Sequence, residues 1–348
     1  MISEKFLQKY GNVTEEYKFY DGEETLRYDP VKHVYYRVSE DGLEVLEGVS
    51  TVSHIVDKSD ILIPWACKMM AQAILLSPGI PEDRAAFEKL VLGSKSAHKD
   101  KLEDAGNIGK QAHEWIENYI RKQLGLAYVL NTPTDERVMS ACAAALDWMQ
   151  KHNVRWLSTE QKVYSRLYRY AGTMDGRCLT DSCSDPNCCP ISFKDKKTLA
   201  DWKTSNYLYI EFILQTGAYK KAYEEETGDL LDDIWVIRLG KEDGEFDPWH
   251  LTPLMIELGQ RAFLSALSLS RDMADLKDEM AYIKDQARAA ERAIKAAAKA
   301  EALKLKCANA DKYKGIRVPQ CNGGNPCKAC LDKYNAVHEK TLDKSEEV

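Results

Sequence analysis

The residues with the clearest chemical capacity in this chain are Asp201 and Lys203, which interrupt the apolar stretch "LADWKTSNYLYIEFILQTGAY" of residues 199–219. Because side chains alternate between the two faces of a strand, Asp201 and Lys203 point to one side and Trp202 and Thr204 to the other. An acid and an amine therefore share one patch. The patch is either an ordinary surface ion pair on an edge strand or part of a reactive site, and the pair alone does not decide between them.

The residues after Asn206 have helical spacing, and Gln215 lies one turn before Tyr219. The stretch therefore predicts a strand, a short loop and a helix. Gln215 and Tyr219 are either polar groups on a packing helix or supports for a site at the end of the strand.

A second carboxylate that could join Asp201 lies upstream, in "YAGTMDGRC", where Gly172 offers a turn and Asp175 falls on the following strand. Mg²⁺ and Mn²⁺ prefer carboxylate oxygens, so two aspartates on adjacent strands can hold one ion against a phosphate. Farther upstream, "GKQAHEWIE" places His113 in a helix, four residues after Gly109. A single histidine there is by default a packed core residue.

Composition limits the classes of protein that the chain can represent. Its 348 residues are 44% hydrophobic, which predicts a globular protein with a real core, and the net charge of −7 argues against nucleic-acid binding by a large basic surface alone. Residues 151–170 nevertheless interleave cations with aromatic rings, a combination that suits a phosphate backbone and its bases. A strand hairpin with a solvated basic face is the alternative.

The N-terminus has neither the basic start nor the apolar core of a signal peptide, and no apolar run is long enough to span a membrane. We therefore expect a cytoplasmic protein without a membrane partner. Ten cysteines in such a chain are unsuited to disulfides, so clustered ones become candidates for metal binding.

Hydrophobic periodicity predicts an α/β fold. Residues 24–49 predict a small antiparallel sheet, residues 135–152 a helix, and residues 253–306 continuous helix. Further strands are expected near 154–158, 161–170, 173–180, 197–204 and 233–239. Within the last helical region an alanine-rich seam of coiled-coil spacing predicts close packing against a neighbouring helix; its members are Leu276, Met280, Ile283, Ala287, Ala290, Ile294 and Ala297.

Four short motifs, taken in order, carry a family resemblance: Gly109 to His113, Gly172-Thr-Met-Asp175, Asp201-Trp-Lys203 and Gln215-x-x-x-Tyr219. This set resembles the PD-(D/E)XK nuclease superfamily, in particular its RecB-type exonuclease branch. The stretches "LRYDPVKHVYYRV", "GVSTVSHIV" and "LIPWACKMM" also look like the start of phage exonucleases and of the mitochondrial genome maintenance exonuclease. The resemblance covers roughly residues 24–240.

The resemblance implies a restriction-endonuclease-like core, with a mixed central sheet flanked by helices. Residues 1–56 would be an N-terminal β-rich segment packing on the core. Residues 57–250 would be the nuclease core, with a cysteine-containing insertion at 178–197. Residues 251–348 would form a helical extension with a C-terminal cysteine cluster.

The resemblance also implies roles for individual residues. Asp175, Asp201, His113 and the backbone carbonyl of Trp202 would bind Mg²⁺ or Mn²⁺, and Lys203 would orient or deprotonate the attacking water. Gln215 and Tyr219 would support the site and contact DNA. Residues with a looser expected connection to DNA are Ser50, Thr51, Glu160, Arg166 and Arg169. Ser50, Thr51 and Ser53 could instead cap a helix, and we favour capping for at least one of them.

Two cysteine groups predict a further metal site. The insertion contains Cys178, Cys183, Cys188 and Cys189, in which Cys183 and Cys188 have a spacing that zinc tolerates. The C-terminal segment contains Cys307, Cys321, Cys327 and Cys330, and both zinc and an iron-sulphur cluster are admissible there. Cys67 is the early cysteine that an iron-sulphur cluster of this nuclease branch would use, although the late cysteines have the reverse order of short and long gaps.

The expected function is metal-dependent hydrolysis of DNA by an exonuclease that serves recombination, replication or repair in a bacterium or a phage-infected cell. Its partners would be DNA with linear or single-stranded ends, and a recombination or replication protein. An endonuclease of the same fold, a non-catalytic DNA-binding scaffold and a redox metalloprotein remain alternatives.

Overall fold

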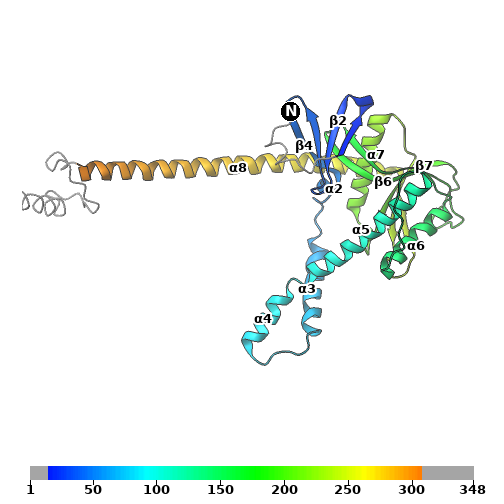
Figure 1. Ribbon diagram of the computed structural model, residues 1–348, viewed down its shortest axis with the longest axis horizontal. Helices are drawn as coiled ribbons and strands as arrows, with labels where there is room; N and C mark the ends of the chain where they lie inside the picture. The colour runs from blue at the N-terminus through cyan, green and yellow to red at the C-terminus, as the bar shows by residue number, and fades with distance from the viewer. Residues whose placement is uncertain (1–14, 308–348) are drawn as a thin grey trace, which may run out of the picture. The chain divides into compact units, whose positions relative to one another are not determined.

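The computed structural model describes residues 15–307 of the chain, and the side chains of residues 15–298 (Figure 1). The chain divides into two compact units, Met1–Ser270 and Arg271–Val348. The first unit is α/β, with a mixed open sheet flanked by helices. No helix in the described part is both long and apolar enough to cross a membrane.

The strands form a nine-stranded sheet. They are β1 (Glu15–Phe19), β2 (Glu24–Asp29), β3 (Val34–Ser39), β4 (Gly42–Gly48), β5 (Arg155–Ser165), β6 (Tyr170–Thr180), β7 (Lys196–Lys203), β8 (Asp233–Leu239) and β9 (Phe246–His250). The order is β1-β2-β3-β4-β6-β7-β8-β9, with β5 pairing with β6. The predicted sheet of residues 24–49 is confirmed as β2–β4, and a parallel β4–β6 pairing makes it continuous with the central sheet.

The helices of the structure are α2 (Val49–Ser53), α3 (Ser59–Leu75), α4 (Arg84–Ser94), α5 (Ala97–Gln123), α6 (Glu136–Lys151), α7 (Ile210–Thr227) and α8 (Pro253–Cys307). The helix predicted at 135–152 is confirmed as α6. Successive residues of β8 enter opposite cores: Ile234 and Val236 pack with α2, α7 and the start of α8, whereas Trp235 and Ile237 pack with α5 and α6. This alternation shows that β8 is covered by helices on both faces.

The strand prediction for residues 154–170 is wrong in one respect. The structure has one strand, β5, where the pattern predicts two, and this strand ends at Ser165. A register shift between Trp156 and Ser158 keeps β5 paired with β6 on both sides of the irregularity. β9 has no counterpart among the predicted strands. The connection between β6 and β7 contains residues 181–195, a shorter segment than the predicted insertion at 178–197.

Helices α7 and α8 approach each other at glycines. A Cβ atom on Gly259 would lie 2.6 Å from the carbonyl oxygen of Ile213, and one on Gly217 would lie 2.9 Å from the amide nitrogen of Gln260. Because these obstacles are backbone atoms, they cannot move aside as a side chain can. The glycines therefore set the separation of the two helices.

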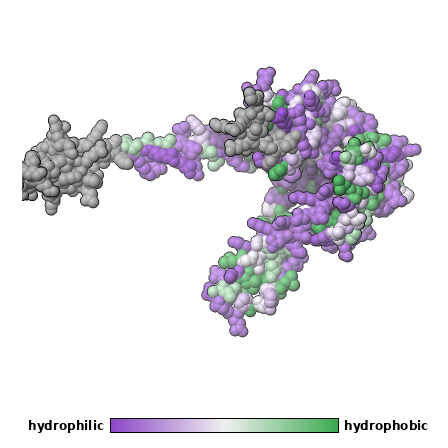
Figure 2. Space-filling model, in the orientation of Figure 1, coloured by the Kyte–Doolittle hydropathy of each residue, from purple (hydrophilic) through white to green (hydrophobic). Residues whose placement is uncertain are grey.

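Helix α3 is rich in apolar residues, yet none of its side chains is buried. Figure 2 shows hydrophobic colour over α3 and α4, and the exposed apolar residues there include Ile61, Ile63, Leu75, Leu76 and Phe87. In the second unit, the members of the predicted seam between Leu276 and Ala297 are likewise exposed. The expected packing against a neighbouring helix thus stays a prediction.

Candidate active site

The candidate site lies where β6 and β7 separate. The two strands pair from Thr180 and Lys196 up to Gly176 and Ala200, and the next residues toward the gap are Asp175 and Asp201. Past the last pair, the amide of Trp202 donates a hydrogen bond of 2.8 Å to Asp175 Oδ2. The Asp175 carboxylate thus accepts the hydrogen bond that a backbone carbonyl of a paired strand would otherwise accept, and this bond fixes it where the two strands separate.

Asp201 and Lys203 form the ion pair that their alternation on the strand predicts. Lys203 Nζ lies 2.6 Å from Asp201 Oδ2, and the two side chains are only 14% and 1% exposed. Neither oxygen of Asp201 accepts a hydrogen bond of ordinary geometry from the described residues, so the ion pair is the main compensation for its burial. This is not an exposed edge-strand ion pair, because β7 lies between β6 and β8.

His113 reaches the same place from α5. Its Nδ1 lies 3.8 Å from Asp175 Oδ2. Burial, together with the charge of Lys203, lowers the pKa of His113 from 6.5 to about 4, so the imidazole is neutral at pH 7 and keeps a free lone pair. One turn earlier, a Cβ on Gly109 would lie 2.7 Å from Thr204 Oγ1, which shows how closely α5 passes the end of β7.

The charges in the gap perturb one another. Burial raises the pKa of Asp175 and raises that of Asp201 to about 6, with Lys203 opposing the shift in both cases. Burial disfavours the Lys203 ammonium, but the carboxylates of Asp201 and Asp175 outweigh it and raise the Lys203 pKa. Asp175 and Asp201 both have raised pKa values, and Lys203 is the cation paired with them. An additional cation between the two carboxylates would therefore stabilise their ionised forms.

Glu160 joins this group from β5. It lies between the pairs Thr159–Gly176 and Gln161–Met174, opposite Asp175, and its φ of 48° marks a local distortion of the strand. Burial and the charge of Asp175 raise the pKa of Glu160 from 4.5 to about 8. Glu160 thus lies beside Asp175, and the contact with DNA that is expected of it stays a prediction.

We predict a pH-dependent stability change for Glu160→Gln. The pKa of Glu160 is higher in the folded than in the unfolded chain, so folding favours the protonated acid. The resulting contribution to the stability of the wild type is fully present below about pH 4.5 and is lost as the pH rises through about 8. In EDTA at about pH 9 the variant should be more stable than the wild type by about 1–2 kcal/mol, a value discounted for partial exposure, and the difference should vanish toward about pH 4.5. Urea unfolding across this range measures it; a difference that is constant with pH would contradict the prediction.

Tyr219 and Gln215 of α7 complete the lining of the gap. Gln215 Nε2 donates a hydrogen bond of 2.7 Å to Tyr219 Oη, and Tyr219 is buried. The turn predicted at Gly172 is wrong, because Gly172 lies within β6 and pairs with Val163. A Cβ on Gly172 would lie 2.5 Å from the Tyr219 ring, so the glycine makes room for the tyrosine. Burial, with a smaller contribution from the charge of Asp201, raises the pKa of Tyr219, and the phenol stays protonated.

Among the residues with a looser expected connection to DNA, Glu160 lies opposite Asp175, whereas the other four lie apart from this group. Ser50 and Thr51 are exposed on α2, whose N-cap residue is Gly48 and which has no side-chain cap, so the capping interpretation is wrong. Ser53 is buried and donates to the carbonyl of Val49 at 2.9 Å. Arg166 and Arg169 lie in the turn between β5 and β6, about 20 Å or more along β6 from Asp175. They form ion pairs with Glu23 and Glu44, respectively.

Two further residues near Lys203, Glu211 and Phe212, belong to none of the sequence motifs. Glu211, buried at the start of α7, forms an ion pair with Lys58, and its charge reaches Lys203. The ring of Phe212 lies 4.9 Å from Lys203 Nζ. Single residues at a helix start have no spacing that marks them, so only the packing of α7 against the sheet reveals them.

A second group of ligand-type side chains lies away from the gap. His152, Cys183, Cys188 and Cys189 offer ligand atoms that all lie within 4.8 Å of one another, and this group could hold a metal ion. Cys178, the other insertion cysteine, is buried in the core that contains α5 and α6. The predicted site of Cys307, Cys321, Cys327 and Cys330 lies outside the residues whose side chains are described.

No family model matches the chain, and a search of curated proteins finds no match.

Proposed function

We propose that the chain is a metal-dependent deoxyribonuclease with a restriction-endonuclease-like core, and that the gap between β6 and β7 is its active site. The observation that carries the proposal is the convergence of Asp175, Asp201, Lys203 and His113 from three separate elements at the point where two strands part. An ordinary buried ion pair would need neither the second carboxylate nor the neutral imidazole.

The residues present fit a divalent cation. Asp201 Oδ1 is a buried oxygen without a hydrogen-bond partner among the described residues, which is the kind of atom that a bound cation would satisfy. Carboxylate oxygens from Asp175 and Asp201 suit Mg²⁺ or Mn²⁺, and the neutral His113 suits Mn²⁺ in particular. The Trp202 backbone, which contacts both Asp175 and His113, would supply the further carbonyl ligand.

A bound cation would activate a water molecule and offset negative charge on the phosphate. The chain's own residues would do the rest. Lys203 is paired with Asp201, so a cation that takes over this carboxylate would leave the ammonium free to orient the water or to stabilise the charge that develops on the phosphate oxygen. Tyr219, held by Gln215, is a protonated donor close to the same carboxylates.

An exonuclease in recombination, replication or repair is our preferred form of this activity, acting on linear or single-stranded DNA ends. An endonuclease would use the same residues, since the chemistry of the gap does not depend on a DNA end. A non-catalytic scaffold is disfavoured because retaining the buried Asp201 and the largely buried Asp175 beside a largely buried lysine costs stability without a cation to bind.

The test is digestion of end-labelled linear DNA and of closed circular single-stranded DNA with Mg²⁺, Mn²⁺ or EDTA. The proposal expects loss of the linear DNA with either metal and none with EDTA. Cutting of the circle would establish the endonuclease instead. Bound but uncut DNA under every condition would overturn the catalytic proposal and favour the scaffold.

A further inference from the structure

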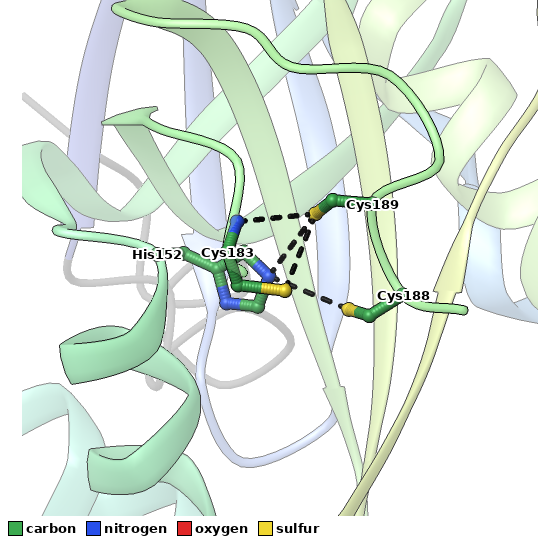
Figure 3. A group of neighbouring side chains, drawn as sticks. All are labelled: His152, Cys183, Cys188 and Cys189. Atoms are coloured by element: carbon green, nitrogen blue, oxygen red, sulfur yellow. Dashed lines mark hydrogen bonds between the residues drawn. The ribbon is translucent and has the colours of Figure 1, made fainter. Parts of the chain in front are cut away.

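The cysteine–histidine cluster, which consists of His152, Cys183, Cys188 and Cys189, brings together parts of the chain that are distant in sequence (Figure 3). His152 follows the last turn of α6, and the three cysteines belong to the connection between β6 and β7. All four side chains point toward a common centre. The six described cysteines, these three among them, are free thiols.

Three distances within the cluster are close to the edges of a tetrahedron around one ion, and all of its ligand atoms lie within 4.8 Å of one another. Zinc binds thiolate at about 2.3 Å and imidazole at about 2.0–2.1 Å, so tetrahedral geometry requires sulphur–sulphur edges of about 3.8 Å and sulphur–nitrogen edges of about 3.5 Å. The Sγ atoms of Cys183 and Cys189 lie 3.5 Å apart. His152 Nε2 lies 3.5 Å from Cys188 Sγ and 3.7 Å from Cys189 Sγ.

The imidazole is oriented for metal binding. His152 Nδ1 lies 2.9 Å from the carbonyl oxygen of Trp148, which can only accept, so Nδ1 carries the proton and Nε2 presents its lone pair to the three sulphurs. The ring is buried and is held edge to face by Trp235 at 4.8 Å between centroids. A backbone carbonyl behind a histidine is the partner that commonly fixes a metal-binding tautomer.

The loop that carries the cysteines is arranged around the same centre. The amides of Cys188 and Cys189 both donate to the carbonyl of Asp185, at 3.2 and 2.8 Å, which makes a tight turn and directs two adjacent side chains inward. The amide of Cys183 donates to Cys189 Sγ at 3.3 Å. This hydrogen bond helps to hold the Cys189 sulphur in position within the cluster.

The cluster is accessible from outside. A cavity of about 550 Å³ is lined by Cys183, Cys188 and Asp185 together with Lys151 of α6 and Phe246 of β9. An ion could therefore reach the sulphurs after the core has formed, which gives the site an entry path.

We propose that this cluster binds one Zn²⁺ ion with a structural role, closed by three thiolates and one imidazole. Four protein ligands leave no open position for a substrate or water, which distinguishes the site from a catalytic zinc centre. The ion fastens residues 181–195, which contain no regular helix or strand, to the end of α6. It thereby closes the hairpin whose strands carry Asp175 and Asp201, and it is independent of any cation at those carboxylates.

The test is the zinc content of the purified full-length chain, together with Co²⁺ substitution. We expect the wild type to contain one equivalent of zinc more than Cys188→Ser or His152→Gln. The Co²⁺-loaded wild type should show the intense visible bands of a tetrahedral thiolate site, and Cys188→Ser should lose them. Removal of zinc by a strong chelator should lower the melting temperature by about 5 °C or more.

Two matched controls separate this site from the other cysteines. Cys67→Ser changes an exposed thiol on α3 and should retain all of the zinc. The combined variant Cys321→Ser, Cys327→Ser and Cys330→Ser should retain the equivalent that Cys188→Ser loses, whatever the C-terminal cysteines bind.

Three results would overturn the proposal. They are iron in place of zinc, a disulfide within the cluster in protein purified under reducing conditions, or equal zinc content in the wild type and in Cys188→Ser. Because metal content and the Co²⁺ spectrum do not depend on DNA cleavage, this result is separate from the outcome of the nuclease assay.

Discussion

Asp201→Asn is expected to reduce metal-dependent DNA cleavage by roughly 10³-fold or more while DNA binding is retained. Asparagine keeps the shape of the side chain but removes the charge that a divalent cation requires at this buried position. Burial already raises the pKa of Asp201 to about 6, so the neutral residue removes an unfavourable charge, and the loss of its pairing with Lys203 opposes that gain. We therefore expect the variant to fold, with cleavage affected far more than the melting temperature.

The matched control for this prediction is Asp247→Asn, which makes the same chemical change at an exposed carboxylate on the edge strand β9. Asp247 Oδ2 lies 3.4 Å from Arg238 Nε at the surface, and strand β8 separates Asp247 from Lys203 on β7. It should cleave DNA at the wild-type rate. The measurement is single-turnover cleavage of end-labelled DNA with Mg²⁺ or Mn²⁺, alongside binding in EDTA. Cleavage by Asp201→Asn within about tenfold of the wild type would remove Asp201 from the proposed site.

Gly259→Ala is expected to destabilise the first unit by about 3 kcal/mol or more. A methyl group at this position would lie 2.6 Å from the carbonyl oxygen of Ile213 and 3.1 Å from its carbonyl carbon, so α7 and α8 would have to move apart. Alanine improves the intrinsic helix propensity by only about 1 kcal/mol, which is too little to offset the separation of two packed helices. The shift would also disturb the α7 helix that presents Tyr219 and Gln215 to the gap.

The control for Gly259 is Gly93→Ala in α4, where no other atom lies within 4 Å of the added methyl group. At this exposed helical position only the propensity gain remains, and the variant should be more stable by about 0.5–1 kcal/mol. Urea unfolding of both variants measures the contrast. If Gly259→Ala were as stable as Gly93→Ala, the close approach of α7 and α8 would be disproved.

Local pattern in the sequence determined several features of this protein. The period of two in residues 201–204 places Asp201 and Lys203 on one side of β7, and the structure brings their charged atoms to 2.6 Å. Gln215 and Tyr219, one helical turn apart, form the hydrogen bond that their spacing allows. The helix at residues 135–152 and the sheet of residues 24–49 were also predictable. These features depend on the repeat of a single element, which the order of side chains along the chain specifies directly.

Only the tertiary structure decided which elements meet. His113 and Asp175 are 62 positions apart, and the packing of α5 on the sheet brings them to 3.8 Å. His152 belongs to a helix end whose pattern predicts nothing but core packing, and it completes a cluster with cysteines that lie more than thirty positions later. The single strand β5 and the pairing of β4 with β6 were likewise not predictable from local pattern. Such contacts depend on the path of the connecting segments and on the fit of two distant surfaces, and neither property repeats along the chain at a readable period.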